Sequence, residues 1–309
     1  MPYAPDDPRS QLAGPAVARR PAGEPLPLQS FDFTRLEPDV VTAGGSRSWI
    51  VRAMNVVFLL TELAPADVLG RDDVDETLTV VLATEGSVSF DAGGSVASVQ
   101  RRAVAMLPPG QSTISADGPA RLLRLFATTA RDLVEQSRNA DVYREQPDTI
   151  ALTPPWPEPV GGSRLRVYDE VDGIAPSPQR MGRIFRNRHA MVNLLYPRVG
   201  PRDPGTLSPH FHDDFEQLSY VDEGTYTHHV RTQWGTDRRM WRADEHVTIG
   251  GPSLAIIPPP LVHTSEAIGA GENRMVDIFA GPRADFSGRP GWVLNAADYP
   301  APAGIGTAS

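Results

Sequence analysis

Short hydrophobic runs recur at close spacing along most of the chain. Each contains β-branched, aromatic or other apolar residues, and Gly, Pro or Asp separates it from the next. Such runs predict β-strands, because amphipathic helices need longer segments with a period near 3.6 residues. The runs in the first half are residues 49–51, 56–60, 78–82, 87–90, 103–107 and 122–126. This pattern is typical of an antiparallel sandwich or barrel.

A second series of such runs follows a polar, proline-rich segment. These runs are residues 165–168, 191–196, 217–221, 225–230, 254–257 and 275–279. Residues 131–163 separate the two series, with a weak helical pattern over 131–145 and a proline cluster at 153–157 that predicts an inter-domain linker. We therefore expect domains at 31–130 and 164–290. Residues 1–30 and 291–309 are expected to be flexible tails, although the first could instead pack along a neighbouring subunit.

The two series keep the same order of local features, which predicts a duplicated domain. Residues 57–60, 84–86 and 105–110 parallel 193–196, 222–224 and 255–260, with offsets of 136, 138 and 150 residues. All seven histidines lie at position 189 or later, so only the second copy can use imidazole ligands.

Four residues of the second copy are candidate metal ligands. On a strand, His210 and His212 would project from the same face about 6.6 Å apart. Glu216 and the more distant His263 would complete a set of nitrogen and oxygen donors, with Asp213 or Asp214 as an alternative to Glu216. Such a set suits one divalent transition metal ion: Fe(II), Mn(II), Ni(II), Co(II) or Zn(II).

The segment HFHDDFEQLSYVDEG, followed by IIPPPLVHTS, resembles the two conserved motifs of the cupin superfamily. With the duplicated layout, the chain resembles a bicupin. The resemblance implies an all-β fold of two tandem double-stranded β-helix (jelly-roll) barrels. It also implies that His210, His212, Glu216 and His263 are the ligands of the C-terminal barrel. Pro260 replaces the usual Gly of the second motif, and no Asn follows His263 at the usual place.

Counting along the repeat predicts which residues occupy the ligand positions of the first copy. They are Asp72, Val74, Leu78 and Thr113. Because this set has no histidine, we expect the N-terminal barrel to be structural.

Several other residues near the motifs are candidates for catalysis or substrate binding. Tyr220 shares a strand face with Glu216 and could act as an acid or base, or pack in the barrel wall. His228 and His229 must point to opposite faces, so at most one, taken as His228, could serve in catalysis. Arg231, Arg239 and Trp241 lie between the motifs, where they could form a lid that binds an anionic or aromatic substrate, or could be solvated loop residues.

Composition excludes several classes of protein. The chain has no cysteine and no lysine, which excludes disulfides, thiolate chemistry and a lysine Schiff base. A net charge of −9 without a basic tract argues against a nucleic-acid partner. No apolar run is long enough for a membrane span, and the N-terminus lacks the pattern of a secretory signal. We expect a cytoplasmic protein, and by analogy with cupins a homodimer.

Two reaction classes follow from such a metal site. With a redox-active ion, a chelating substrate and O2 would give a dioxygenase, and fold-level analogy favours this oxidoreductase reading with Fe(II). With a Lewis-acid ion, the enzyme would be an isomerase, lyase or hydrolase of a sugar or organic acid. A third possibility is a non-catalytic protein that binds a small ligand. In each case the partner is a small molecule.

Overall fold

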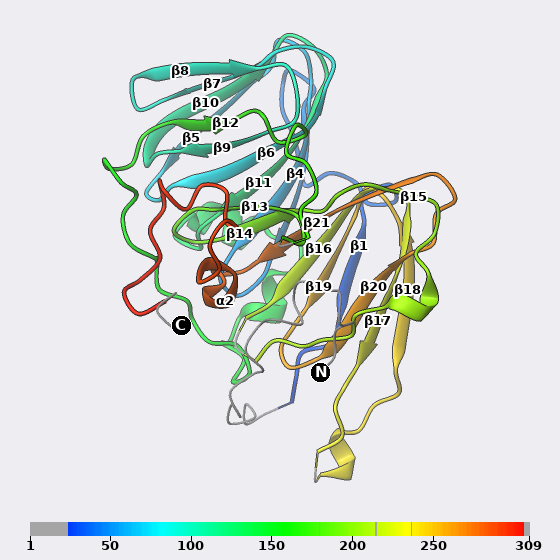
Figure 1. The fold of residues 1–309 in the computed structure, drawn as a ribbon. Coiled ribbons are helices and arrows are strands. Elements are labelled where there is room, and N and C mark those ends of the chain that lie inside the picture. Colours follow the sequence, from blue (N-terminus) through cyan, green and yellow to red (C-terminus); the bar gives the residue numbers. More distant parts are fainter. Residues whose placement is uncertain (1–23, 179, 214, 236, 306–309) are drawn as a thin grey trace.

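Two β-barrels make up the molecule, and each consists of a large and a small sheet (Figure 1). The computed structural model describes residues 24–178, 180–213, 215–235 and 237–305. Neighbouring strands within the sheets pair antiparallel, as in β16 (Gln217–Glu223) against β21 (Glu272–Phe279). The expected all-β fold with two tandem barrels is confirmed.

The N-terminal barrel contains nearly all strands of the first half of the chain. Its strands are β2 (Val40–Val41), β3 (Arg47–Arg52), β4 (Val57–Leu63), β5 (Val68–Asp73), β6 (Thr77–Thr84), β7 (Val88–Ala92), β8 (Ser95–Val99), β9 (Ala103–Leu107), β10 (Gly110–Ala116), β11 (Ala120–Phe126) and β12 (Arg166–Tyr168). The large sheet has the order β12-β9-β6-β11-β4-β3-β2, and the small sheet has the order β5-β10-β7-β8. The hydrophobic pattern missed β5, β8 and β10, in which polar residues interrupt the apolar ones.

The C-terminal barrel has the same two-sheet construction. Its strands, besides β16 and β21, are β1 (Gln29–Asp32), β13 (Arg183–Arg186), β14 (Met191–Leu194), β15 (Arg198–Val199), β17 (Thr225–Arg231), β18 (Glu245–Gly250), β19 (Ser253–Ile257) and β20 (Val262–Ala267). The large sheet has the order β1-β19-β16-β21-β14-β13, with β15 added to β21, and the small sheet has the order β18-β17-β20.

Helical segments are short and lie outside the sheets. They are α1 (Arg131–Gln136), η2 (Ala140–Tyr143), η3 (Pro204–Thr206), η4 (Arg238–Met240) and α2 (Ala284–Ser287). The first two lie in the predicted linker, where a weak helical pattern was noted. None of the helices in the described parts of the chain has the length and apolar character that crossing a bilayer requires.

Each barrel borrows one strand from the other half of the chain. Strand β1 pairs with β19, with Phe31 opposite Leu254, and β12 pairs with β9, with Val167 opposite Ala105. In Figure 1 the blue β1 lies among the strands of the C-terminal barrel, and the green β12 lies beside β9. The sequence-based boundaries at residues 31 and 164 therefore do not separate the two barrels.

The final segment, expected to be a flexible tail from residue 291, packs against the barrels up to Tyr299. Trp292 and Tyr299 are buried, and the Leu294 amide donates a hydrogen bond to the carbonyl of Ile184. Of the two predicted tails, residues 1–23 and 306–309 lie outside the described residues.

The largest apolar core lies between the barrels. It joins Phe58 and Leu78 of the N-terminal large sheet to Leu218, Tyr220 and Ile256 of the C-terminal large sheet. The rings of Phe58 and Tyr220 are 5.7 Å apart. Because side chains alternate along a strand, a residue of β16 faces either the other barrel or the interior of its own barrel. This alternation decides which side chains reach the candidate site.

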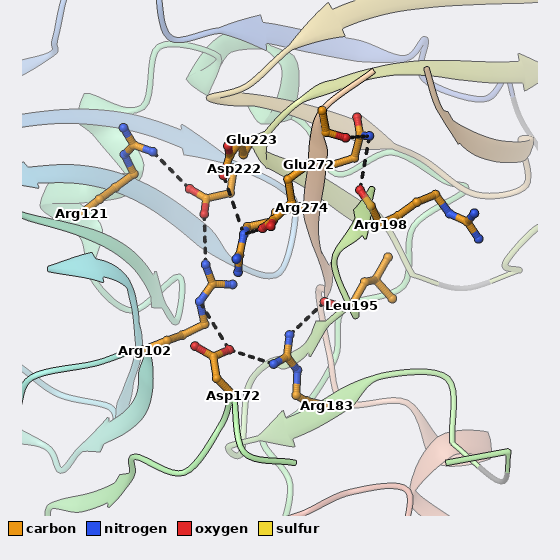
Figure 2. Close-up of polar contacts among 12 residues, drawn as sticks. Arg102, Arg121, Asp172, Arg183, Leu195, Arg198, Asp222, Glu223, Glu272 and Arg274 are labelled. Carbon is orange, nitrogen blue, oxygen red and sulfur yellow. Dashed lines mark hydrogen bonds and ion pairs between the residues drawn. The ribbon is translucent and has the colours of Figure 1, made fainter. Parts of the chain in front are cut away.

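A network of ion pairs joins the barrels at the edge of this core (Figure 2). Asp222 accepts contacts from Arg102 at 3.4 Å and Arg121 at 3.3 Å, both from the N-terminal barrel. Arg102 also lies 4.0 Å from Asp172, which pairs with Arg183 at 2.8 Å. The network therefore fixes the N-terminal barrel to β16 and to the segment that leads into β13.

Glu76 provides a pH-dependent contribution to stability. Tyr299 donates a hydrogen bond to this buried carboxyl group, and burial raises the pKa of Glu76 to about 7. Since the folded pKa lies above the ordinary value of 4.5, the stabilising contribution is full below pH 4.5 and is lost as the pH rises through 7. Compared with the wild type, Glu76→Gln should lose about 3 kcal/mol less unfolding free energy over this range.

Urea denaturation between pH 4.5 and 7 measures this difference. The exposed Glu85, changed to Gln, serves as the control and should follow the wild-type curve. Parallel curves for Glu76→Gln and the wild type would contradict the assignment.

Candidate metal centre

Three histidines converge inside the C-terminal barrel. His210 and His212 precede β16, and His263 lies on β20. Backbone hydrogen bonds join His210 and His263 in both directions, at 3.0 and 2.7 Å. The ring centroids are 4.4 Å apart for His210 and His263, and 5.0 Å apart for His210 and His212. One ligand nitrogen from each ring lies within 4.8 Å of the others, so this His triad could hold a metal ion.

Carbonyl oxygens fix the tautomers of two of these rings. Nδ1 of His210 is 2.9 Å from the carbonyl oxygen of Ser208, and Nδ1 of His263 is 3.0 Å from that of Leu261. Because a carbonyl oxygen only accepts, each Nδ1 carries the proton and each Nε2 keeps the lone pair that a metal requires. Burial, the charge of Arg283 and the neighbouring histidines lower the pKa of His212 well below its usual range. These neutral, oriented imidazoles fit a divalent metal ion.

The structure does not bring Glu216 to the triad. Its carboxylate lies between the barrels, where it accepts hydrogen bonds from the Tyr143 hydroxyl at 2.7 Å and the Met54 amide at 2.6 Å. Burial raises the pKa of Glu216 to about 7. The predicted ligand set is corrected here, because Glu216 shares the face of β16 that is turned away from the histidines. Asp213 is not part of the cluster, and Asp214 lies outside the described residues.

Gln217, the next residue, faces the triad instead. Its Oε1 is 2.9 Å from Nε2 of His212, and its Nε2 donates to Oδ1 of Asp277 at 3.2 Å. Ser219 also donates to Asp277, at 2.9 Å. All of these side chains are buried. Sequence reasoning missed Gln217 and Asp277, although the alternation of apolar residues at 218 and 220 indicated that 217 and 219 share the opposite face.

A cavity of about 520 Å³ opens beside the triad. Its wall includes basic, acidic, hydroxyl and imidazole groups: Arg180, Arg198, Arg202, Asp277, Tyr196, Tyr226, Ser177, Thr206, Ser208, Gln217, Thr264, Ser265, His210 and His263. Asp277 is the one acidic residue among the described residues that line it, against three arginines. The cavity therefore favours an anionic ligand.

Arg180 is held in place by neutral oxygens. It donates to the carbonyls of Gly182 at 2.8 Å and Ala175 at 3.0 Å, and to the Tyr196 hydroxyl at 3.1 Å. Because none of these acceptors is charged, the guanidinium keeps its positive charge toward the cavity.

The two predicted catalytic residues have different surroundings. Tyr220 is fully buried in the inter-barrel core and donates to Asp222 at 3.2 Å, so it does not face the cavity. His228 faces the barrel interior and lies 2.9 Å from Oγ of Ser265, a cavity residue. Burial and the neighbouring His263 and His229 lower the pKa of His228 to about 4. The neutral His228 remains a candidate, and Tyr226, which lines the cavity, takes the place expected for Tyr220.

The predicted substrate-binding residues lie away from this cavity. Arg231 pairs with Asp244 at 2.5 Å, and Arg239 pairs with Asp237 at 2.7 Å, each close in sequence. Trp241 stacks on Trp234 with ring centroids 4.4 Å apart. None of the three is among the described residues of the cavity wall, so the predicted lid does not cover it.

The four first-copy residues predicted at ligand positions do not line the equivalent space of the N-terminal barrel. Val74 is 70% exposed, and Leu78 belongs to the inter-barrel core. Asp72 and Thr113 are also exposed. The count was displaced because it used the turn glycines as its reference, whereas the sheet register aligns Thr79 with Ser219.

Charged side chains occupy that space instead. Arg124 lies opposite Thr79, as Asp277 lies opposite Ser219 in the other barrel. It is buried and donates to Thr61 at 2.9 Å. With the ion-paired Arg71 and Asp73 it lines a small cavity of about 10 Å³. The N-terminal barrel therefore contains a fixed cation where the C-terminal barrel has its acidic residue.

Comparisons with known proteins support the fold. Neither a protein-family model nor a curated protein sequence matches the chain. A point mutant of Bacillus subtilis oxalate decarboxylase has a TM-score of 0.55 at 14% identity, covering 88% of this chain and 80% of that one. A Lactobacillus farciminis oxalate decarboxylase in complex with formate has a TM-score of 0.54 at 12% identity, covering 87% and 88%. These likenesses show the fold, and the bicupin architecture predicted from the motifs is confirmed.

Proposed function

We propose that the protein is a metal-dependent enzyme that acts on a small organic acid inside the C-terminal barrel. The observation that carries this proposal is the His triad beside a cavity lined by Arg180, Arg198 and Arg202. The size of the cavity suits a small molecule. Its arginines suit a carboxylate, which a guanidinium can bind at two points.

The residues of the cavity have separate roles in this proposal. His210, His212 and His263 hold a divalent metal ion, which when bound would polarise an oxygen of the substrate. Arg180 and Arg198 bind the carboxylate and orient it. Burial and the charge of Asp277 raise the pKa of Tyr226, so its hydroxyl stays protonated and can donate a hydrogen bond or a proton.

The proposed reaction is a decarboxylation. Loss of CO2 leaves an electron pair on carbon, and that carbon must then take a proton, for which Tyr226 is the candidate donor. The fold-level analogy that favoured an Fe(II) dioxygenase now favours a lyase, since the similar structures are oxalate decarboxylases by name. The proposal is compatible with Mn(II), Fe(II) or Co(II).

Gas exchange tests the reaction class. The protein would be loaded with Mn(II), Fe(II) or Co(II) and supplied with small mono- and dicarboxylates, while CO2 release and O2 uptake are followed. The lyase proposal expects CO2 release without net O2 consumption. Stoichiometric O2 uptake with Fe(II) would replace it by the dioxygenase, and no turnover with any metal would contradict an enzyme of this class.

Arg198 tests the substrate charge. Its side chain is exposed at the cavity wall, and we expect Arg198→Ala to raise KM for the carboxylate about tenfold by removing a charged hydrogen bond. Metal content should not change. The exposed Arg35, changed to Ala, is the matched control and should keep the wild-type KM. An unchanged KM in Arg198→Ala would remove this residue from substrate binding.

A further inference from the structure

We propose that Gln217 is the fourth donor of the metal centre and that Asp277 supplies its negative charge through the Gln217 amide. This inference rests on the proposed function, because it concerns the same metal site. It assigns a ligand role to a neutral residue and a positioning role to a carboxylate that does not itself reach the metal.

The contacts of Gln217 define the orientation of its amide. Nε2 lies 3.2 Å from both Oδ1 of Asp277 and Oγ of Ser219. The opposite orientation would place Oε1 against the carboxylate, where two acceptors repel each other. Asp277 therefore directs Oε1 of Gln217 toward the histidines.

The position of Oε1 is that of a ligand atom. It lies 2.9 Å from Nε2 of His212. Two donors bound to one metal at about 2.1 Å, with a right angle between them, are separated by roughly 3 Å. The distance thus fits two neighbouring ligands of one ion as well as a hydrogen bond between the two side chains.

The charge of the site explains why Asp277 matters. Three imidazoles and an amide are all neutral, so a divalent ion would keep its full charge. Asp277 is buried, with 7% of its surface exposed, and its carboxylate polarises the amide that it binds. A second observation supports the role of this position: in the N-terminal barrel, where no described residues form a His triad, Arg124 occupies it.

Metal binding of three variants tests the inference. Asp277→Asn removes the charge and keeps an oxygen acceptor for Gln217, so we expect affinity for Mn(II) or Co(II) to fall 10- to 100-fold. Gln217→Ala should fall by at least as much. In Gln217→Glu/Asp277→Asn the carboxylate moves into direct contact with the metal, and affinity should return to within about threefold of the wild type.

Glu266→Gln is the charge control. Glu266 lies on the outer face of β20, 3.0 Å from Nε2 of His229, so its removal takes one negative charge from the same sheet without touching the cavity. Its Mn(II) affinity should equal that of the wild type. Circular dichroism of the metal-free variants would establish that all of them fold.

Calorimetric titration with Mn(II) and a crystal structure of the Co(II)-loaded protein are the readouts. The inference expects Oε1 of Gln217 at about 2.1 Å from the metal. Unchanged affinity in Asp277→Asn or Gln217→Ala, or an amide oxygen beyond about 3 Å, would overturn it. If these metal data hold but no carboxylate is turned over, the proposed function fails alone.

Discussion

Changing His210 to Ala is expected to abolish metal binding and to lower kcat at least about 10³-fold. The variant removes one of the three imidazoles of the triad, and the backbone pairing of residues 210 and 263 does not depend on the side chain. A loss of this size corresponds to about 4 kcal/mol of transition-state stabilisation, which is within the contribution of a catalytic metal. Metal analysis of the purified variant and steady-state kinetics measure the two effects.

His246→Ala is the matched control for this experiment. His246 is exposed on β18 and contacts His229 on the outer face of the small sheet, 2.8 Å between the two Nδ1 atoms. It should retain both metal and activity. Full activity in His210→Ala would refute a metal-centred mechanism.

Changing Asp222 to Ala is expected to destabilise the protein by about 3 kcal/mol, because it leaves Arg102 and Arg121 without their shared carboxylate at a buried position. The Tyr220 hydroxyl would lose its acceptor as well. Urea denaturation measures the change in unfolding free energy. Figure 2 shows why both barrels should respond together, since Arg102 and Arg121 reach Asp222 from the other barrel.

Asp237→Ala provides the comparison for this second experiment. Asp237 pairs with Arg239 on an exposed segment, where water screens the charges, so the denaturation midpoint should not move. An Asp222→Ala variant as stable as Asp237→Ala would show that the inter-barrel ion pairs contribute nothing.

The sequence was sufficient to predict the barrels and the three histidines. The strands of the large sheets are apolar enough to be recognised, and the spacing of His210 and His212 on an extended chain requires a common face. The error at Glu216 was an error of one residue in register. A carboxylate was chosen by its chemistry, whereas the alternation of Leu218 and Tyr220 toward the other barrel decides that Gln217 faces the site.

The remaining errors concern contacts between distant segments. Nothing local indicates that Tyr220 meets Phe58, and this contact turns a candidate catalytic residue into part of the core. Conversely, Arg231 and Arg239 find acidic partners within their own segment, so their charges are not available to a substrate. Tyr226 and Asp277 reach the cavity only through the closure of the barrel.

The exchange of β1 has a consequence for biosynthesis. On the ribosome Phe31 emerges early, but its partner Leu254 is made only after nearly all of both barrels. At ordinary elongation rates the interval is on the order of tens of seconds. The N-terminal barrel can complete its large sheet as soon as β12 leaves the exit tunnel, while β1 waits unpaired. The last barrel to be translated is therefore closed by one of the first strands, which makes its completion the final event of folding.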